Sequence, residues 1–339
     1  MTPRATQPIL VTGGGGFLGK TVCRQLRERG YQVRSFSRGA YPELETMGVE
    51  CRQGSLHDLS AVTAALEGCS GVFHCAGNVD VWGRWKDLYA TNVMGTEHVL
   101  AGMRAHGIQN MVFTSSPSVV CTSHSLEGVN ESQPYPTRYL SAYPETKALA
   151  EKRVMSAHGK GVHTVSIRPH FIWGPGDPHL LANLILARKK NLLRPIGPRT
   201  NLVDAIYVDN AAQAHIQAFE TLGQDPSRVG GKVYFVGQES PVNLWGFIDR
   251  MLESAGMDPL QTTRSVPLPV AYGFGFLCEK FYAWRGIYDR LPPMTRFIAL
   301  QMANSGYFSH AQAERDFGYH PTVSIETGLA RLRAFSLDS

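Results

Sequence analysis

Four consecutive glycines near the N-terminus, in the string PILVTGGGGFLGKTV, constrain the fold of this chain more than any other feature. They follow a short apolar run at residues 9–11, typical of a buried strand, and precede apolar residues at helical spacing. The glycines therefore join a strand to a helix. Gly13 or Gly14 combines with Gly16 and Gly19 into a TGxxGxxG or GxGxxG pattern. Such a turn lets backbone N–H groups approach a pyrophosphate, so it predicts a dinucleotide site.

Composition excludes several other classes of protein. The chain has 339 residues, a net charge of +5 and six scattered cysteines without metal-site spacing, so we expect neither a metal nor a nucleic-acid partner. No apolar stretch is long enough to predict a transmembrane helix. The absence of a signal peptide and the unpaired pattern of cysteines predict a cytoplasmic protein.

Strand-like and helix-like stretches alternate through the first two-thirds of the chain. Strands are expected at residues 9–11, 32–38, 71–77, 110–116 and 163–169, and long helices at 91–107 and 143–159. This order predicts an α/β fold with a doubly wound parallel sheet of the Rossmann type. We assign residues 1–173 to a nucleotide-binding domain and 174–339 mainly to a smaller C-terminal substrate-binding lobe. Strand and helix pieces at about 200–236 are candidates to return to the first domain.

A tyrosine and a lysine lie one helical turn apart in the string YPETKALAEK. At this spacing Tyr143 and Lys147 share one face of a helix, and a nearby ammonium lowers the pKa of a tyrosine from its usual value of about 10. Such a tyrosine can exchange a proton with a carbonyl or carbinol oxygen. The alternative is a surface pair without a role, because this spacing is common by chance.

Two serines follow the apolar strand at residues 111–113. Ser115 and Ser116 either cap a turn before Pro117 or orient a substrate oxygen at the carboxyl end of the strand. The glycine turn upstream and the Tyr–Lys pair downstream favour the second interpretation.

Together these motifs resemble one enzyme superfamily. The strings TGGGGFLG, HCAG, TNVMGT, TSSPSV, YPETK and RPHFIWGPGD resemble extended short-chain dehydrogenases/reductases. VWGRW, NLVDAIYVDNAAQAH and YFSHAQAERDFGYHPTVSIETGL resemble the 3β-hydroxysteroid dehydrogenase-like branch. Within that branch they are most similar to bacterial 2-alkyl-3-oxoalkanoate reductases of olefin biosynthesis, and C4-sterol carboxylate 3-dehydrogenases share several of them.

The resemblance implies roles for matching residues. Tyr143 would be the acid/base, Lys147 would lower its pKa and hold the nicotinamide ribose, and Ser116, or Ser115 beside it, would bond the substrate oxygen. Trp82 and Trp85 are candidates to line the substrate cleft. The implied cofactor contacts are Gly13, Gly16, Phe17, Leu18, Gly19, Ser37, Arg38, Ser55, Leu56, Ala76, Gly77, Tyr143, Lys147, Pro169 and His170.

The end of the second strand indicates which nicotinamide cofactor is used. An acidic residue there binds the free ribose hydroxyl of NAD, whereas this chain has Ser37 followed by Arg38. A serine and an arginine suit the 2′-phosphate, so NADP(H) is predicted over NAD(H). The alternative is that Arg38 is a solvated loop charge. A further departure from the family is Ser55, which replaces the aspartate often found beside the adenine, and we do not assume that Asp58 substitutes for it.

The resulting prediction is NADPH-dependent reduction of a ketone on a bulky, lipid-like substrate, most closely a 2-alkyl-3-oxoalkanoate. The alternatives are a decarboxylating 3β-hydroxysteroid or C4-sterol carboxylate dehydrogenase and a non-catalytic NADP(H) sensor. The resemblance also implies a homodimer through the two long helices, with Val93, Val99, Leu149 and Val154 as apolar residues. The aromatic segment at 270–288 is either core of the lobe or a mobile cap that contacts membrane or a partner enzyme.

Overall fold

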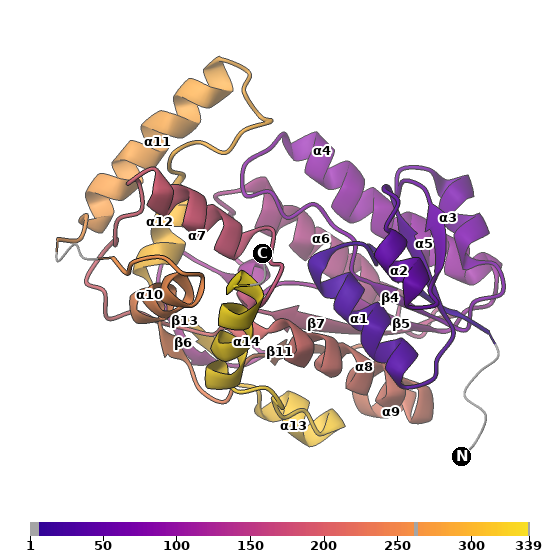
Figure 1. Cartoon of the computed structure of the whole chain (residues 1–339). Coiled ribbons are helices and arrows are strands. Elements are labelled where there is room, and N and C mark those ends of the chain that lie inside the picture. Colours follow the sequence, from indigo (N-terminus) through magenta and orange to yellow (C-terminus); the bar gives the residue numbers. More distant parts are fainter. Residues whose placement is uncertain (1–6, 261–263, 338–339) are drawn as a thin grey trace.

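A parallel seven-stranded sheet forms the centre of the computed structural model, which describes residues 7–260 and 264–337 (Figure 1). The strand order is β11-β7-β5-β4-β1-β2-β3, which confirms the doubly wound fold. From β1 the chain first adds β2 and β3 on one side of the sheet and then β4, β5, β7 and β11 on the other side, so the strand order changes direction between β1 and β4. Open parallel sheets bind ligands at the carboxyl ends of the strands at such a point. The strands are β1 (Ile9–Thr12), β2 (Val33–Ser37), β3 (Glu50–Gln53), β4 (Gly71–His74), β5 (Asn110–Thr114), β7 (His163–Pro169) and β11 (Val233–Val236).

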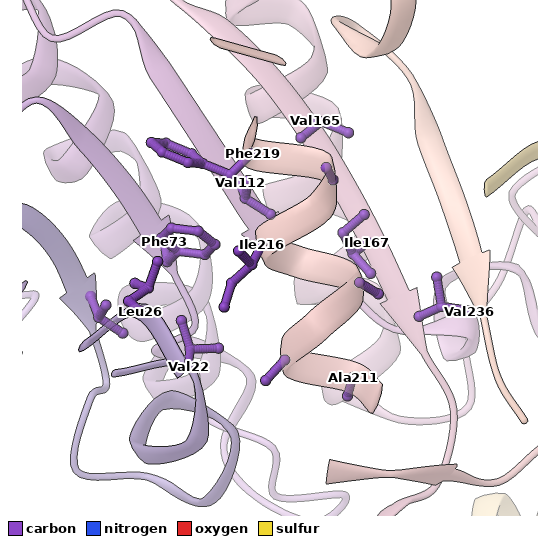
Figure 2. Packing of buried hydrophobic residues seen from close by; sticks show 14 of the residues in the cluster. Val22, Leu26, Phe73, Val112, Val165, Ile167, Ala211, Ile216, Phe219 and Val236 are labelled. Carbon is purple, nitrogen blue, oxygen red and sulfur yellow. The ribbon is translucent and has the colours of Figure 1, made fainter. Parts of the chain in front are cut away.

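Helices cover both faces of this sheet because successive strand residues point to opposite sides. On β4, Phe73 packs in one core with α1 (Phe17–Glu28) and α8 (Val208–Gln224), and Figure 2 shows α8 lying on the strands. The neighbouring Val72 packs in the other core, with α3 (Leu59–Leu66), α5 (Gly95–Ala105) and α6 (Ala142–Ala157).

Of the edge strands of the central sheet, β3 is absent from the set expected from the sequence, and β11 lies within the pieces at about 200–236 that were candidates to return to the first domain. β3 has the largely polar sequence ECRQ, is mostly exposed, and pairs with β2 at the edge of the sheet. β11 pairs with β7 at the opposite edge, so residues 208–236 reach the central sheet through α8 and β11. The polar sequence of β3 carries no local strand pattern, whereas the apolar run of β11 does.

A second group of elements packs around its own core, which contains the buried Trp173, Trp245 and Phe247. Its small sheet has the order β12-β9-β13-β6, so a strand from the first half of the chain is joined by strands from the second half. These strands are β6 (Leu126–Val129), β9 (Leu202–Val203), β12 (Val242–Asn243) and β13 (Gly306–Phe308). The helices are α7 (Leu180–Lys189), α10 (Leu244–Ser254), α11 (Leu268–Trp284), α12 (Arg296–Ala303) and α14 (Ile325–Leu337).

Shorter elements connect these units. They are α2 (Pro42–Thr46), α4 (Trp85–Tyr89), a π-helix (Ala90–Met94), a 3₁₀ helix (Pro117–Val120), β8 (Ile172–Trp173), β10 (Ile206–Tyr207), α9 (Pro226–Val229) and α13 (Ala311–Phe317). Among the described residues, no helix combines the length and apolar character needed to cross a bilayer.

Candidate active site

The glycine turn lies between β1 and α1 and has no room for side chains. Gly13 has φ +69°, and a Cβ there would lie 2.8 Å from the Cα atom of Ala76. A Cβ on Gly19 would lie 2.1 Å from the carbonyl oxygen of Gly13. Helix α1 therefore packs directly on the turn, and only glycine allows this approach.

The N-terminus of α1 is open. Gly16 is its N-cap residue and no side chain caps the helix, so the N–H groups of Phe17, Leu18 and Gly19 keep their capacity to bind an external acceptor. Together with the bare turn, this is the arrangement that a pyrophosphate requires. The predicted glycine contacts thus fit a dinucleotide by geometry.

The carboxyl end of β2 lies next to the turn. The Ser37 hydroxyl accepts from the Gly15 N–H at 3.1 Å and lies 3.5 Å from the Ser35 hydroxyl, where either serine can be the donor. Arg38 is exposed, and no described residue forms an ion pair or hydrogen bond with it. Arg34, by contrast, donates to Glu50 at 2.9 Å and to the Ala65 carbonyl at 2.9 Å, which holds it away from the turn.

The residues expected beside the adenine have structural partners. The Ser55 hydroxyl accepts from the His57 N–H at 3.2 Å, and the side chain of Leu56 is buried. Asp58 caps α3 by accepting from the Ala61 N–H at 3.0 Å. Asp58 therefore has a local structural role of its own.

A buried hydrogen-bond chain runs from β1 through His74. Thr12 Oγ1 accepts from the Ala76 N–H at 3.3 Å, so its hydrogen goes to His74 Nδ1 at 2.6 Å. Thr96 Oγ1 donates to the Asn92 carbonyl at 2.6 Å and must accept from His74 Nε2 at 3.0 Å. Burial lowers the pKa of His74 to about 3, so the ring stays neutral with its proton on Nε2.

Asn92, in the π-helix, joins this chain to α6. Its Oδ1 accepts from the Asn78 N–H at 2.7 Å, and its Nδ2 donates to the Asn78 carbonyl and to Thr146 Oγ1, both at 3.0 Å. A Cβ on Gly77 would lie 3.2 Å from Asn92 Oδ1 and 3.8 Å from Lys147 Nζ. The loop after β4 thus lies directly beside the lysine.

Ser116 and Tyr143 come together at the carboxyl end of β5. The Ser116 hydroxyl accepts from the Ser118 N–H at 3.2 Å and from its hydroxyl at 2.9 Å, so it both caps the 3₁₀ helix and keeps its own hydrogen free to donate. Burial raises the pKa of Tyr143, although hydrogen bonding with Ser116 and Ser118 opposes that rise.

The sequence predicted that Lys147 lowers the pKa of Tyr143, but the main influence on this pKa is burial, which raises it, and Lys147 is not among the principal influences. Lys147 Nζ donates to the Thr114 carbonyl at 2.6 Å and lies 4.4 Å from the centre of the Phe113 ring. Burial lowers the pKa of Lys147 to about 8, while Glu151 acts in the opposite direction. The Lys147 ammonium is therefore fixed by its hydrogen bond to the end of β5 and packs against an apolar ring.

Ser115 is not among the hydrogen-bond partners of Tyr143, whereas Ser116 is. Ser115 is buried, and its hydroxyl forms no well-aligned hydrogen bond within the described residues, although its proximity contributes to the lower pKa of the Glu151 carboxyl. Burial opposes this lowering, and the main cause that overcomes it is Arg168, whose Nη2 lies 2.6 Å from Glu151 Oε1. Ser116 is thus the serine that the structure places at the site.

Pro169 is the last residue of β7, and His170 follows it directly. Pro169 pairs with Val236 of β11. The His170 ring stacks on Phe171 with 4.1 Å between centroids and contacts Phe308 of the small sheet. Burial lowers the pKa of His170 to about 4, so it is a neutral packed ring, and the expected cofactor contact falls to its backbone.

The two tryptophans after β4 bind different elements. Trp82 Nε1 donates to the Ile287 carbonyl at 2.9 Å, and its ring stacks on Tyr288 with 5.6 Å between centroids. Trp85 Nε1 donates to Glu145 Oε2 at 3.1 Å on α6. A cavity between these elements is lined by Val81, Trp82, Gly83, Leu140, Ser141, Ala142, Glu279, Thr295 and Phe297. It reaches the start of α6, next to Tyr143.

Comparison with known proteins places this geometry in a family. Residues 10–269 match the 3-beta hydroxysteroid dehydrogenase/isomerase family. A 2-alkyl-3-oxoalkanoate reductase of Stenotrophomonas maltophilia is 42% identical over 97% of this chain and 99% of its own length. A decarboxylating sterol-4-alpha-carboxylate 3-dehydrogenase of Mus musculus is 34% identical over 95% of this chain and 88% of its own. The structure of a Thermus thermophilus UDP-glucose 4-epimerase with NAD is similar in fold, with TM-score 0.73, 21% identity and coverage of 98% and 99%.

Proposed function

Because the chain belongs to the 3-beta hydroxysteroid dehydrogenase/isomerase family, and is an NAD(P)-dependent oxidoreductase of the extended short-chain dehydrogenase/reductase type, we propose a specific reaction for it. It reduces the ketone of a 2-alkyl-3-oxoalkanoate to the 2-alkyl-3-hydroxyalkanoate, with NADPH, in the cytoplasm. The observation that carries this proposal is the Ser116–Tyr143 hydroxyl pair with Lys147 one turn further along α6. The 42% identical bacterial reductase supports the substrate class.

The glycine turn and the N-terminus of α1 would hold the pyrophosphate, Ser37 and Arg38 the 2′-phosphate, and Lys147 the nicotinamide ribose. When bound, the cofactor supplies the hydride for the carbonyl carbon. The free guanidinium of Arg38 supports NADP, since no described residue pairs with it.

The protein's own residues manage the carbonyl oxygen. Ser116 accepts two hydrogen bonds from Ser118, which orients its remaining hydrogen for donation to that oxygen. Tyr143 then transfers its phenolic proton to the oxygen as negative charge develops there.

Lys147 stabilises the phenolate that this transfer leaves behind. The ammonium is fixed by the Thr114 carbonyl and stands against the Phe113 ring, where little water screens its charge. The raised pKa of Tyr143 keeps the proton on the hydroxyl until a substrate oxygen needs it.

The direct test follows nicotinamide absorbance in both directions: oxidation of NADPH with a 2-alkyl-3-oxo acid, and reduction of NADP+ or NAD+ with a panel of 3β-hydroxysterols and a C4-carboxysterol. We expect turnover with the oxo acid. Turnover of the carboxysterol alone, with release of carbon dioxide, would favour the sterol dehydrogenase alternative. Cofactor binding without turnover of any substrate would favour a sensor.

A further inference from the structure

The third glycine of the N-terminal run has a neighbour that the nucleotide-binding pattern does not explain. Gly15 is a variable position in both TGxxGxxG and GxGxxG, and its φ lies outside the left-handed region, so neither the motif nor the backbone requires glycine there. A Cβ on Gly15 would overlap the ring of Tyr41, whose Cδ2, Cε2 and Cζ atoms fill that place. The tyrosine ring therefore requires the glycine.

Tyr41 lies beside the residues to which we assign the 2′-phosphate. It follows β2 and is the N-cap residue of α2. The end of its ring that carries the hydroxyl group covers Gly15, whose N–H donates to Ser37, and a Cβ on Gly39 would lie 3.4 Å from the hydroxyl oxygen. Because Gly39 follows Arg38 directly, the Tyr41 hydroxyl is close to both the glycine turn and the arginine that follows β2.

The Tyr41 hydroxyl has a hydrogen to donate. Within residues 7–260 and 264–337, no group forms a hydrogen bond with it. A phosphate group presents three acceptor oxygens, and a guanidinium fork binds two of them at once, so a further donor is needed for the third. The hydroxyl of Ser37 can spend its hydrogen on Ser35, 3.5 Å away, whereas that of Tyr41 has no competing acceptor.

Helix α2 holds this tyrosine in place. Lys20 Nζ of α1 donates to Glu43 Oε1 of α2 at 2.7 Å, and Leu44 is fully buried in the core that contains α1. The loop from β2 to α2 is therefore fixed at both ends, and a preformed loop loses little conformational freedom when it binds a ligand. The ion pair with Lys20 also reduces the repulsion that Glu43 would exert on a phosphate beside Tyr41.

We propose that Tyr41 is a further determinant of cofactor selectivity: its ring rests on Gly15, and its hydroxyl donates to the 2′-phosphate of NADP beside Arg38. The inference rests on the proposed use of NADPH and adds a third donor to Ser37 and Arg38. It also assigns a function to the third glycine of the run, which leaves room for the ring that positions this donor.

The test is calorimetric binding of 2′,5′-ADP and of 5′-AMP, two ligands that differ only in the 2′-phosphate. The wild type should bind 2′,5′-ADP at least about tenfold more tightly than AMP. Tyr41→Phe keeps the ring and removes the donor, so it should weaken 2′,5′-ADP about tenfold and leave AMP unchanged. Tyr31→Phe is the matched control, because the Tyr31 hydroxyl donates to Glu220 at 3.0 Å on α8, and it should bind both ligands as the wild type does.

A double-mutant cycle tests the seat of the ring. Gly15→Ala should displace the ring and weaken 2′,5′-ADP about tenfold in the wild-type background. In a Tyr41→Ala background there is no ring to displace, so the same substitution should add little. The melting temperature of each variant shows that it is folded before its binding is compared.

Three results would overturn the proposal: wild-type affinity of Tyr41→Phe for 2′,5′-ADP, an equal loss of AMP and 2′,5′-ADP in that variant, or the same cost of Gly15→Ala with and without the ring. Arg38→Ala is measured in the same series. If it weakens 2′,5′-ADP while Tyr41→Phe does not, the choice of NADPH stands and the role of Tyr41 is wrong. If the wild type does not distinguish the two ligands, both are wrong.

Discussion

A single hydroxyl carries the proton in the proposed reaction. Tyr143→Phe keeps the ring but removes the proton donor, so turnover should fall by at least about a hundredfold while cofactor binding, followed by nicotinamide fluorescence, stays near the wild-type level. Tyr139→Phe is the matched control, because the Tyr139 hydroxyl donates to the Val119 carbonyl at 2.8 Å and has a structural role. A Tyr143→Phe enzyme with near-native turnover would remove Tyr143 from the mechanism.

The charge of Lys147 sets a pH dependence. Its pKa is lowered to about 8, so the ammonium is present below that pH and is lost as the pH rises through it. The raised pKa of Tyr143 keeps the proton donor intact over the same range. The kcat/KM for reduction should therefore be flat at lower pH and fall above about 8. Lys147→Met should have much lower activity, and the activity that remains should not show this fall above about pH 8. A wild-type profile without the fall would contradict the assignment.

Arg38 tests the choice of cofactor. If its exposed guanidinium binds the 2′-phosphate, Arg38→Ala should lower the ratio of kcat/KM for NADPH over NADH by about tenfold to a hundredfold. Arg104→Ala, at an exposed arginine of α5, should leave the ratio unchanged. A wild type that prefers NADH, or an Arg38→Ala ratio equal to that of the wild type, would change the cofactor to NAD.

At the scale of elements, the packing of α1 on the glycine turn controls nucleotide binding. Gly19→Ala places a Cβ 2.1 Å from the Gly13 carbonyl, so α1 must move away from the turn. Affinity for the cofactor should fall at least about tenfold, and the melting temperature should also fall. Gly223→Ala in α8 is the matched helical control, since its nearest contact of 3.7 Å is ordinary, and it should keep both values or raise stability. Tight nucleotide binding by Gly19→Ala would show that the turn is not the pyrophosphate site.

At the scale of the whole molecule, the structure corrects the residues expected at a dimer interface. Val93, Val99 and Val154 are 1%, 0% and 0% exposed, so they are buried within the subunit, whereas the fourth expected residue, Leu149, is partly exposed. Any partner must instead contact the outer faces of α5 and α6 and of the adjoining π-helix, where Met94 is 44% exposed.

We still expect a homodimer, and light scattering measures it directly. Met94→Glu should shift the equilibrium toward monomer, whereas Leu186→Glu, at a 50% exposed leucine of α7, should not. A wild-type monomer at micromolar concentration would refute the prediction.

Local features of the sequence determined the architecture. A bare turn needs glycine at φ values that other residues avoid, and the periods of strands and helices are visible in short windows, so the Rossmann sheet could be predicted. The Tyr143–Lys147 pair follows from spacing on one helix in the same way. These features depend on neighbours in the chain, and no distant contact is needed to recognise them.

Tertiary structure decided what depends on distant contacts. Only the folded chain brings the Ser116 hydroxyl, from the end of β5, into hydrogen-bond contact with Tyr143 at the start of α6. Burial by residues far away in sequence raises the pKa of Tyr143, which the sequence predicted to be lowered. Desolvation and packing are properties of the assembled core, so a sequence pattern predicts which groups are present but not which of them water will reach.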